Sequence, residues 1–179
     1  MPIVGTLDAA ATPLAVLAKR ISAACADPMD TLADTVRAAL HAASTERALL
    51  SAQQMTARID RYARHLLYAD PAGRFTIVSI VWRPGQYTPI HGHYTWCGYA
   101  VIAGTLREES FDWVPESRGA AHAGSSDRFA GYTCFANAGV DSVHRMTNRS
   151  DCDAVSVHIY GVDGPRVGTH VNRLLCAID

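Results

Sequence analysis

The chain has 179 residues, is 49% apolar and carries a formal net charge of −1, so it can bury a core and shows no basic footprint for nucleic acid. No apolar run approaches the roughly 20 residues that cross a bilayer, which argues against a membrane protein, and no basic segment precedes a hydrophobic one, which argues against a signal peptide. Five scattered cysteines fit a reducing compartment. We therefore expect a cytoplasmic single domain (1–179), and no obligate protein partner is evident.

The first third of the chain is predicted to be an N-terminal helical segment (12–70). Apolar residues recur at helical spacing in two stretches, and two further stretches are compatible with helix. The four expected helices cover residues 14–21, 32–40, 45–55 and 57–63. Asp30 or Thr31 is a suitable cap for the second helix.

The pattern changes at the turn signal Asp70-Pro71-Ala72-Gly73. Beyond it, short β-rich runs alternate with turn residues, and the expected strands cover residues 75–82, 98–103, 105–112, 132–135 and 154–160. Residues 115–130 are polar and are expected to form a long surface loop or a hairpin end. Many short strands with turns between them favour an antiparallel sandwich or barrel, here over 73–165, with the tail 166–179 packing back on it.

Two histidines lie two residues apart shortly after a Pro-Gly turn, at His91 and His93. Because residues i and i+2 of a strand project from the same face, these imidazoles can converge on one ion. His144 offers a third imidazole from a later segment. Three neutral imidazoles with no carboxylate nearby suit a divalent transition metal and leave coordination positions open. The spacing alone does not distinguish iron from zinc.

The strand expected at 154–160 alternates in character. Its apolar residues fall on one face, and Ser156, His158 and Tyr160 fall on the other. These three side chains can form a hydrogen-bonded relay that holds the Tyr160 hydroxyl toward a ligand, or they can simply be a polar barrel interior. They do not form a hydrolase triad, because a mid-strand serine lacks the nucleophile elbow.

The spacing of Gly85, His91, His93, Cys97 and Gly104 resembles the first cupin motif. Cys97 stands where most cupins place a glutamate ligand. The resemblance implies a mainly β protein, a cupin (jelly-roll) barrel preceded by the helical segment.

A second cupin motif is matched more loosely by Gly131, Asn137, Gly139, His144 and Asn148. Asn137 stands where a proline is common, and two extra residues precede the histidine. Together the two motifs cover about half of the chain.

Without the glutamate, the chain resembles the thiol dioxygenases, whose type member is cysteine dioxygenase. The resemblance implies that His91, His93 and His144 bind Fe(II) and that O2 converts a small thiol carboxylate to its sulfinate. A neutral ligand set leaves the ion its full charge, which favours an anionic thiolate. The competing interpretation is a non-oxidative metal-binding cupin, either a zinc or nickel enzyme such as an isomerase, or a sensor.

Thiol dioxygenases carry a Ser-x-His-x-Tyr run like that at 156–160. In addition, Tyr62 and Arg64 resemble the tyrosine and the carboxylate-binding arginine of cysteine dioxygenases. An arginine fork suits a carboxylate because it donates two parallel hydrogen bonds. Alternatively, Arg64 only pairs with Asp60, four residues earlier on a helix.

Cys97 also falls, counted back from Gly104, where some cysteine dioxygenases carry the cysteine of a cysteine–tyrosine thioether. The resemblance implies Tyr160 as its partner in such a crosslink. The simpler alternative is that Cys97 is a small buried residue near the metal.

The residues of this sequence indicate the type of reaction more clearly than they indicate the substrate. Arg64 resembles cysteine-type enzymes, whereas Trp82 and Trp96 resemble relatives acting on 3-mercaptopropionate, which tend to carry glutamine in place of the arginine. Those relatives place a carboxylate-binding arginine a little beyond the tyrosine, where this chain has Arg166. If Arg64 and Arg166 both face the pocket, mercaptosuccinate fits two forks.

Overall fold

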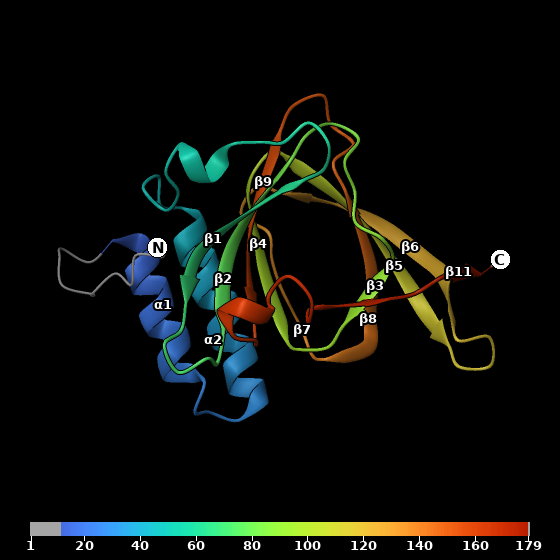
Figure 1. Ribbon diagram of the computed structural model, residues 1–179, viewed down its shortest axis with the longest axis horizontal. Coiled ribbons are helices and arrows are strands. Elements are labelled where there is room, and N and C mark those ends of the chain that lie inside the picture. Colours follow the sequence, from blue (N-terminus) through green and yellow to red (C-terminus); the bar gives the residue numbers. More distant parts are fainter. Residues whose placement is uncertain (1–11, 179) are drawn as a thin grey trace.

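The computed structural model describes residues 12–178 as two helices beside two curled β-sheets (Figure 1). The prediction of a mainly β protein with helices at its N-terminal end is therefore confirmed. The helical elements are α1 (Pro13–Ala24), α2 (Met29–Ser44), and the short 3-10 helices η1 (Gln53–Met55) and η2 (Gly164–Arg166). The strands are β1 (Ala63–Ala69), β2 (Thr76–Trp82), β3 (His91–His93), β4 (Cys97–Ala103), β5 (Thr105–Val114), β6 (Gly119–Phe129), β7 (Thr133–Ala136), β8 (Gly139–Thr147), β9 (Ala154–Tyr160), β10 (Asn172–Leu174) and β11 (Ala177–Ile178).

One sheet has five strands in the order β1-β2-β9-β4-β7, and the other has six in the order β10-β3-β8-β5-β6-β11. All neighbours pair antiparallel except β11, which runs parallel to β6. The two sheets curl around a shared interior (Figure 1). Side chains from both sheets fill it, including Ile80, Trp82, Val101, Leu106 and Met146.

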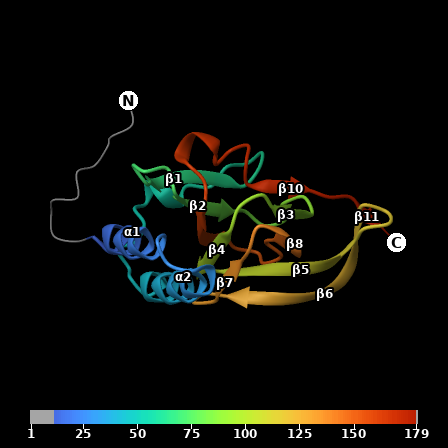
Figure 2. The same ribbon diagram turned by 90° about the horizontal axis from the view of Figure 1, so that it is seen from below.

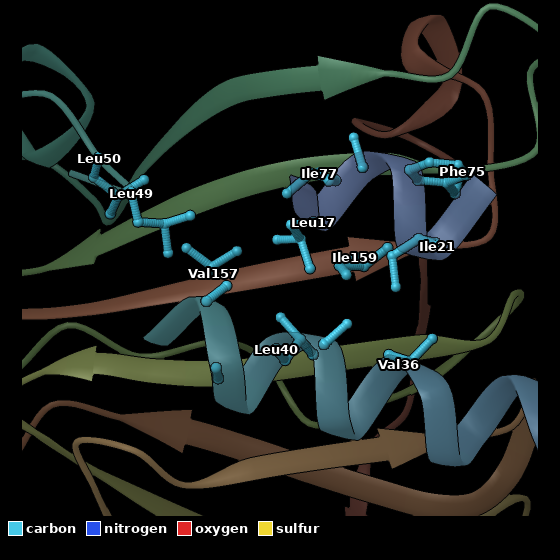
Figure 3. Packing of buried hydrophobic residues seen from close by; sticks show 14 of the residues in the cluster. Leu17, Ile21, Val36, Leu40, Leu49, Leu50, Phe75, Ile77, Val157 and Ile159 are labelled. Atoms are coloured by element: carbon cyan, nitrogen blue, oxygen red, sulfur yellow. The ribbon is translucent and has the colours of Figure 1, made fainter. Parts of the chain in front are cut away.

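The two helices cover the outer face of the five-stranded sheet (Figure 2). Leu17 of α1 and Leu40 of α2 pack on Ile77, Val157 and Ile159 of the sheet (Figure 3). Each such side chain, fully buried, contributes about 1.5–3 kcal/mol of transfer free energy. Because the helices cover one face and the barrel interior the other, every residue of β2 and β9 is buried.

The alternation predicted for β9 is confirmed. Val155, Val157 and Ile159 belong to the cluster beneath the helices, whereas His158 and Tyr160 line the barrel interior. A single strand thus anchors the helices with one face and presents polar groups with the other.

The first two predicted helices are confirmed as α1 and α2, and neither helix in the described chain is long and apolar enough to cross a membrane. The predicted cap of α2 is wrong, because Pro28 is its N-cap residue and no side chain caps it. The helices predicted at 45–55 and 57–63 are also wrong. Only η1 forms there, since Ser44 and Thr45 hydrogen bond back to helix carbonyls at the end of α2 and the chain then crosses to β1.

The five predicted strands are confirmed as β2, β4, β5, β7 and β9. Of the two alternatives predicted for 115–130, the hairpin end is confirmed and the long loop is wrong, because residues 115–118 form the turn and β6 pairs with β5 over ten residue pairs. Its sequence is polar because much of β6 faces solvent. The tail forms β10 and β11, which lie at the two edges of the six-stranded sheet (Figure 2).

Candidate metal centre

Three histidines of the six-stranded sheet converge at the barrel interior. His91 and His93 project together from β3, and His91 lies directly opposite His144 of β8 in the strand register. One ring nitrogen from each lies within 4.8 Å of the others. The prediction that these three imidazoles meet is therefore confirmed, and two of them come from a strand of only three residues.

The donor chemistry of this trio fits a divalent transition metal. Burial, with a smaller contribution from His144, lowers the pKa of His91 to about 3 and that of His93 to about 2. Both rings are therefore neutral near pH 7 and have a lone pair to donate. Nδ1 of His91 lies 2.9 Å from the carbonyl oxygen of Pro89, which can only accept. This hydrogen bond places the proton on Nδ1 and leaves Nε2 free for an ion.

A carboxylate stands behind the third histidine, contrary to the prediction that none lies nearby. Glu108 of β5 accepts a hydrogen bond from Nδ1 of His144 at 2.7 Å. Its other oxygen accepts from Arg128 at 2.8 Å and from the Tyr99 hydroxyl at 3.1 Å. Burial raises the pKa of Glu108, but its bonds to His144 and Arg128 outweigh burial and lower the pKa to about 2. In the sequence, the signal was a glutamate two residues from Leu106, on the inward face of β5.

The opposite wall of the cavity carries the chain of hydrogen bonds along β9. Trp82 donates through Nε1 to Ser156 at 2.9 Å, the Ser156 hydroxyl lies 2.9 Å from Nε2 of His158, and Nδ1 of His158 lies 3.2 Å from the Tyr160 hydroxyl. The buried Ser156 hydroxyl accepts from Trp82, so its own hydrogen finds an acceptor in His158. The neutral His158 ring then carries its proton on Nδ1 and donates to Tyr160. The Tyr160 hydroxyl hydrogen is left free to point into the cavity.

A small cavity between the sheets brings these groups together. The three histidines line it from one side, and His158, Tyr160 and Cys97 line it from the other; Tyr62, Arg64, Ile80, Trp82, Thr88, Met146 and Asn172 complete its wall. Cys97 of β4 lies directly opposite Tyr160 in the register of β4 and β9.

Arg64 reaches the cavity from β1, not from a helix. Its Nη1 donates to the carbonyl oxygen of Val167 at 3.0 Å, and its Nε is buried with no hydrogen-bond partner among residues 12–178. The alternative pairing with Asp60 is wrong, because Asp60 accepts from Arg58 instead. Arg166 lies outside the cavity, with its side chain 65% exposed and 3.7 Å from Asp163. The structure thus brings one predicted carboxylate fork to the site and not the other.

A wider, open pocket of about 640 Å³ adjoins the cavity and shares Tyr62, Arg64 and Asn172 with it. Arg58 and Arg61 lie along its wall. Arg58 and Arg61 both pair with Asp60, whereas Arg64 has no acidic partner among residues 12–178, so Arg64 is the guanidinium there that favours an anionic ligand.

Comparison with known families decides the assignment. Residues 17–168 match the family model of cysteine dioxygenase type I. The chain belongs to this family. The predicted resemblance is confirmed, and the protein is a metal-dependent thiol dioxygenase whose three-histidine centre supplies the metal site.

Three solved structures are similar to parts of this chain. An uncharacterized conserved protein with a double-stranded beta-helix domain from Klebsiella pneumoniae is 16% identical, with a TM-score of 0.50 over 66% of this chain and 93% of that one. A cupin superfamily protein from Desulfitobacterium hafniense is also 16% identical, with a TM-score of 0.49 over 66% and 93% of the two chains. TT1209 from Thermus thermophilus is 16% identical, with a TM-score of 0.49 over 63% and 95%. The two curled sheets and the likeness to the double-stranded beta-helix domain from Klebsiella pneumoniae confirm the predicted cupin barrel.

The buried histidines predict how the metal-free protein responds to acid. An unfolded histidine takes up a proton near pH 6.5, whereas folded His91 and His93 stay neutral down to about pH 3 and 2. The unfolded state therefore binds more protons below pH 6.5. As the pH is lowered, the free energy of unfolding decreases by up to about 1.4 kcal/mol per pH unit for each group. We expect the unfolding free energy of chelator-treated His93→Gln, measured by urea titration, to depend less steeply on pH between about pH 4 and 6.5 than that of the unmodified chain.

The matched control is His170→Gln, since His170 is exposed. Its slope should equal that of the unmodified chain. Identical slopes for the His93 variant and the unmodified protein would contradict the burial of a neutral imidazole at this position.

Proposed function

We propose that the protein is an Fe(II)- and O2-dependent dioxygenase that oxidises the thiol of a small mercapto-carboxylate to its sulfinate. The observation that carries this proposal is that Arg64 and Tyr160 line the same small cavity as the three histidines. The family supports iron and oxygen as the reagents. The arginine supports a carboxylate on the substrate, and the five free cysteines support a cytoplasmic location.

His91, His93 and His144 supply three nitrogen donors from one wall, and a three-histidine set would leave coordination positions of a bound ion open to small molecules. Ferrous iron held there would supply the acidity that deprotonates the substrate thiol and the redox chemistry that activates O2. Cys97 takes the place of a carboxylate ligand, and its buried thiol has a pKa raised by desolvation. It therefore adds no negative charge against a thiolate.

Arg64 is suited to anchor the carboxylate. Its bond to the Val167 carbonyl holds the guanidinium plane in place, and its buried Nε lacks an acceptor. A substrate carboxylate satisfies this donor and gains a charge-assisted hydrogen bond. Fixing the carboxylate also fixes the thiol relative to the histidines, and such positioning is worth up to about 7 kcal/mol of barrier.

Tyr160 presents a hydrogen-bond donor to the reacting groups. The order of donors from Trp82 through Ser156 and His158 leaves the phenol hydrogen unused by the protein. Burial raises the pKa of Tyr160 well above its ordinary value, so the hydroxyl keeps this proton. It stabilises negative charge that develops beside the substrate sulfur or oxygen, at no cost of reorganisation.

Zinc is the second candidate for the metal ion. The observation that favours it is the carboxylate–histidine pair of Glu108 and His144, an arrangement common around zinc. Three imidazoles alone serve either metal.

The proposal is tested by loading the purified protein with Fe(II) and following O2 uptake with cysteine, 3-mercaptopropionate and mercaptosuccinate, with product masses as the second readout. We expect uptake with a thiol that carries one carboxylate, since Arg166 lies outside the cavity. The product should gain two oxygen atoms. No uptake with any thiol, together with tight zinc binding, would favour zinc over iron as the metal and contradict the proposal.

Arg64→Ala is expected to raise KM far more than it lowers kcat. A hydrogen bond to a charged group contributes about 1.5–3 kcal/mol, which corresponds to a roughly ten- to hundredfold loss of substrate affinity. Steady-state kinetics on the best thiol measures both constants. Arg47→Ala is the control, because Arg47 is exposed and does not line the cavity. An unchanged KM in the Arg64 variant would refute carboxylate anchoring.

Cys97 and Tyr160 are expected to form a thioether during turnover, because they face each other across neighbouring strands and line one cavity. A bond between the Cys97 sulfur and a carbon of the Tyr160 ring removes two hydrogens, with O2 as the oxidant. Intact mass spectrometry after turnover should show a fraction lighter by two hydrogens. Cys97→Ser must lack that species, and its absence from the unmodified enzyme after prolonged turnover would exclude the crosslink.

A further inference from the structure

Glu108 occupies the centre of a hydrogen-bond network behind the metal centre. It lies on β5, next to β8 in the six-stranded sheet, and its side chain is only 11% exposed. One of its oxygens accepts from His144 at 2.7 Å, while the other accepts from Arg128 and Tyr99 at 2.8 and 3.1 Å. Both oxygens of the carboxylate therefore accept hydrogen bonds from donors in the described chain.

We propose that Glu108 is a positioning residue that holds His144 with Nε2 toward the metal ion and makes that nitrogen a stronger donor. This rests on the proposed function only in requiring that the three histidines bind a metal. A carboxylate paired with Arg128 can accept but not donate, so Nδ1 of His144 must carry the proton of this bond. Nε2 then keeps its lone pair, and the ring cannot rotate without losing the bond.

The three ligands are not equivalent in this respect. His91 is backed by a neutral carbonyl, that of Pro89, and Nδ1 of His93 has no hydrogen-bond partner within residues 12–178. Among the three, only His144 bonds to a carboxylate in this part of the chain. The hydrogen bond to the negatively charged carboxylate raises the basicity of Nε2 of His144 and so strengthens it as a metal ligand. Loss of Glu108 should therefore weaken metal binding through this histidine.

Arg128 and Tyr99 hold Glu108 at the Nδ1 side of His144, away from Nε2. They occupy its second oxygen, and the Arg128 guanidinium is itself held over the Tyr132 ring at 4.3 Å. A carboxylate without these donors is free to turn toward a divalent cation. The Arg128 charge also offsets that of Glu108, so the centre keeps the positive charge that attracts an anionic thiolate.

The test compares Glu108→Gln with Glu109→Gln. Glu109 is the next residue of β5 and bonds to Arg145 through both oxygens at 2.7 Å, so the control removes a comparable ion pair away from the metal cavity. Metal-free proteins are titrated with Co(II) against a chelator, and the visible spectrum of the bound cobalt is recorded. We expect Glu108→Gln to weaken cobalt binding about 10- to 100-fold and to shift its spectrum, and Glu109→Gln to change neither. Equal affinities for Glu108→Gln and the unmodified protein, or equal losses in both variants, would overturn the proposal.

A measurement on the unmodified protein covers the case in which Glu108→Gln does not fold. In the zinc-loaded protein, long-range nitrogen–proton NMR should place the His144 proton on Nδ1 and the metal on Nε2. Metal on Nδ1 would refute the positioning role. Neither readout depends on thiol oxidation, so a protein that binds metal as expected but consumes no O2 would refute the proposed function and leave this inference standing.

Discussion

The packing of α1 and α2 on the outer face of the five-stranded sheet is the constraint on which the rest of the structure depends. It buries the apolar side of β9, through Val157 and Ile159, and so determines which way each residue of that strand points. Because side chains alternate along a strand, the polar residues have no place except the barrel interior. A slip of one residue would bury His158 under the helices and expose the apolar residues to the cavity.

The two sheets divide the chemistry between them. The six-stranded sheet carries the three histidines and Glu108, and the five-stranded sheet carries Arg64, Cys97 and the hydrogen-bonded residues of β9. The cavity therefore lies between a wall suited to a metal ion and a wall suited to an organic anion. Both walls belong to rigid, paired strands, which hold functional groups more precisely than loops do.

The electrostatics of the centre differ from those of a cupin that uses a glutamate ligand. Cys97 stands at the position of that ligand, and its buried thiol has a raised pKa and carries no charge. The acidic group is instead Glu108, which contacts the rear nitrogen of His144 and is paired with Arg128. The negative charge therefore lies on the far side of the His144 imidazole, and no carboxylate of the described residues lines the cavity itself.

The sequence by itself determined five of the strands, the two N-terminal helices and the alternation of β9. It also determined that His91 and His93 project from the same face of a strand. These features depend on residues a few positions apart, whose geometry follows from the helix or strand period. Residues 45–63 were wrongly predicted as helix, and β6 was not recognised as a strand, because these short or polar stretches carry no clear period. Their conformation depends on strand pairing, and on the path of the chain from α2 to β1. Only the tertiary structure decided that Glu108 meets His144, that Arg64 turns into the cavity and that Arg166 stays outside. Those contacts join residues tens of positions apart, and their directions depend on how the two sheets curl around each other.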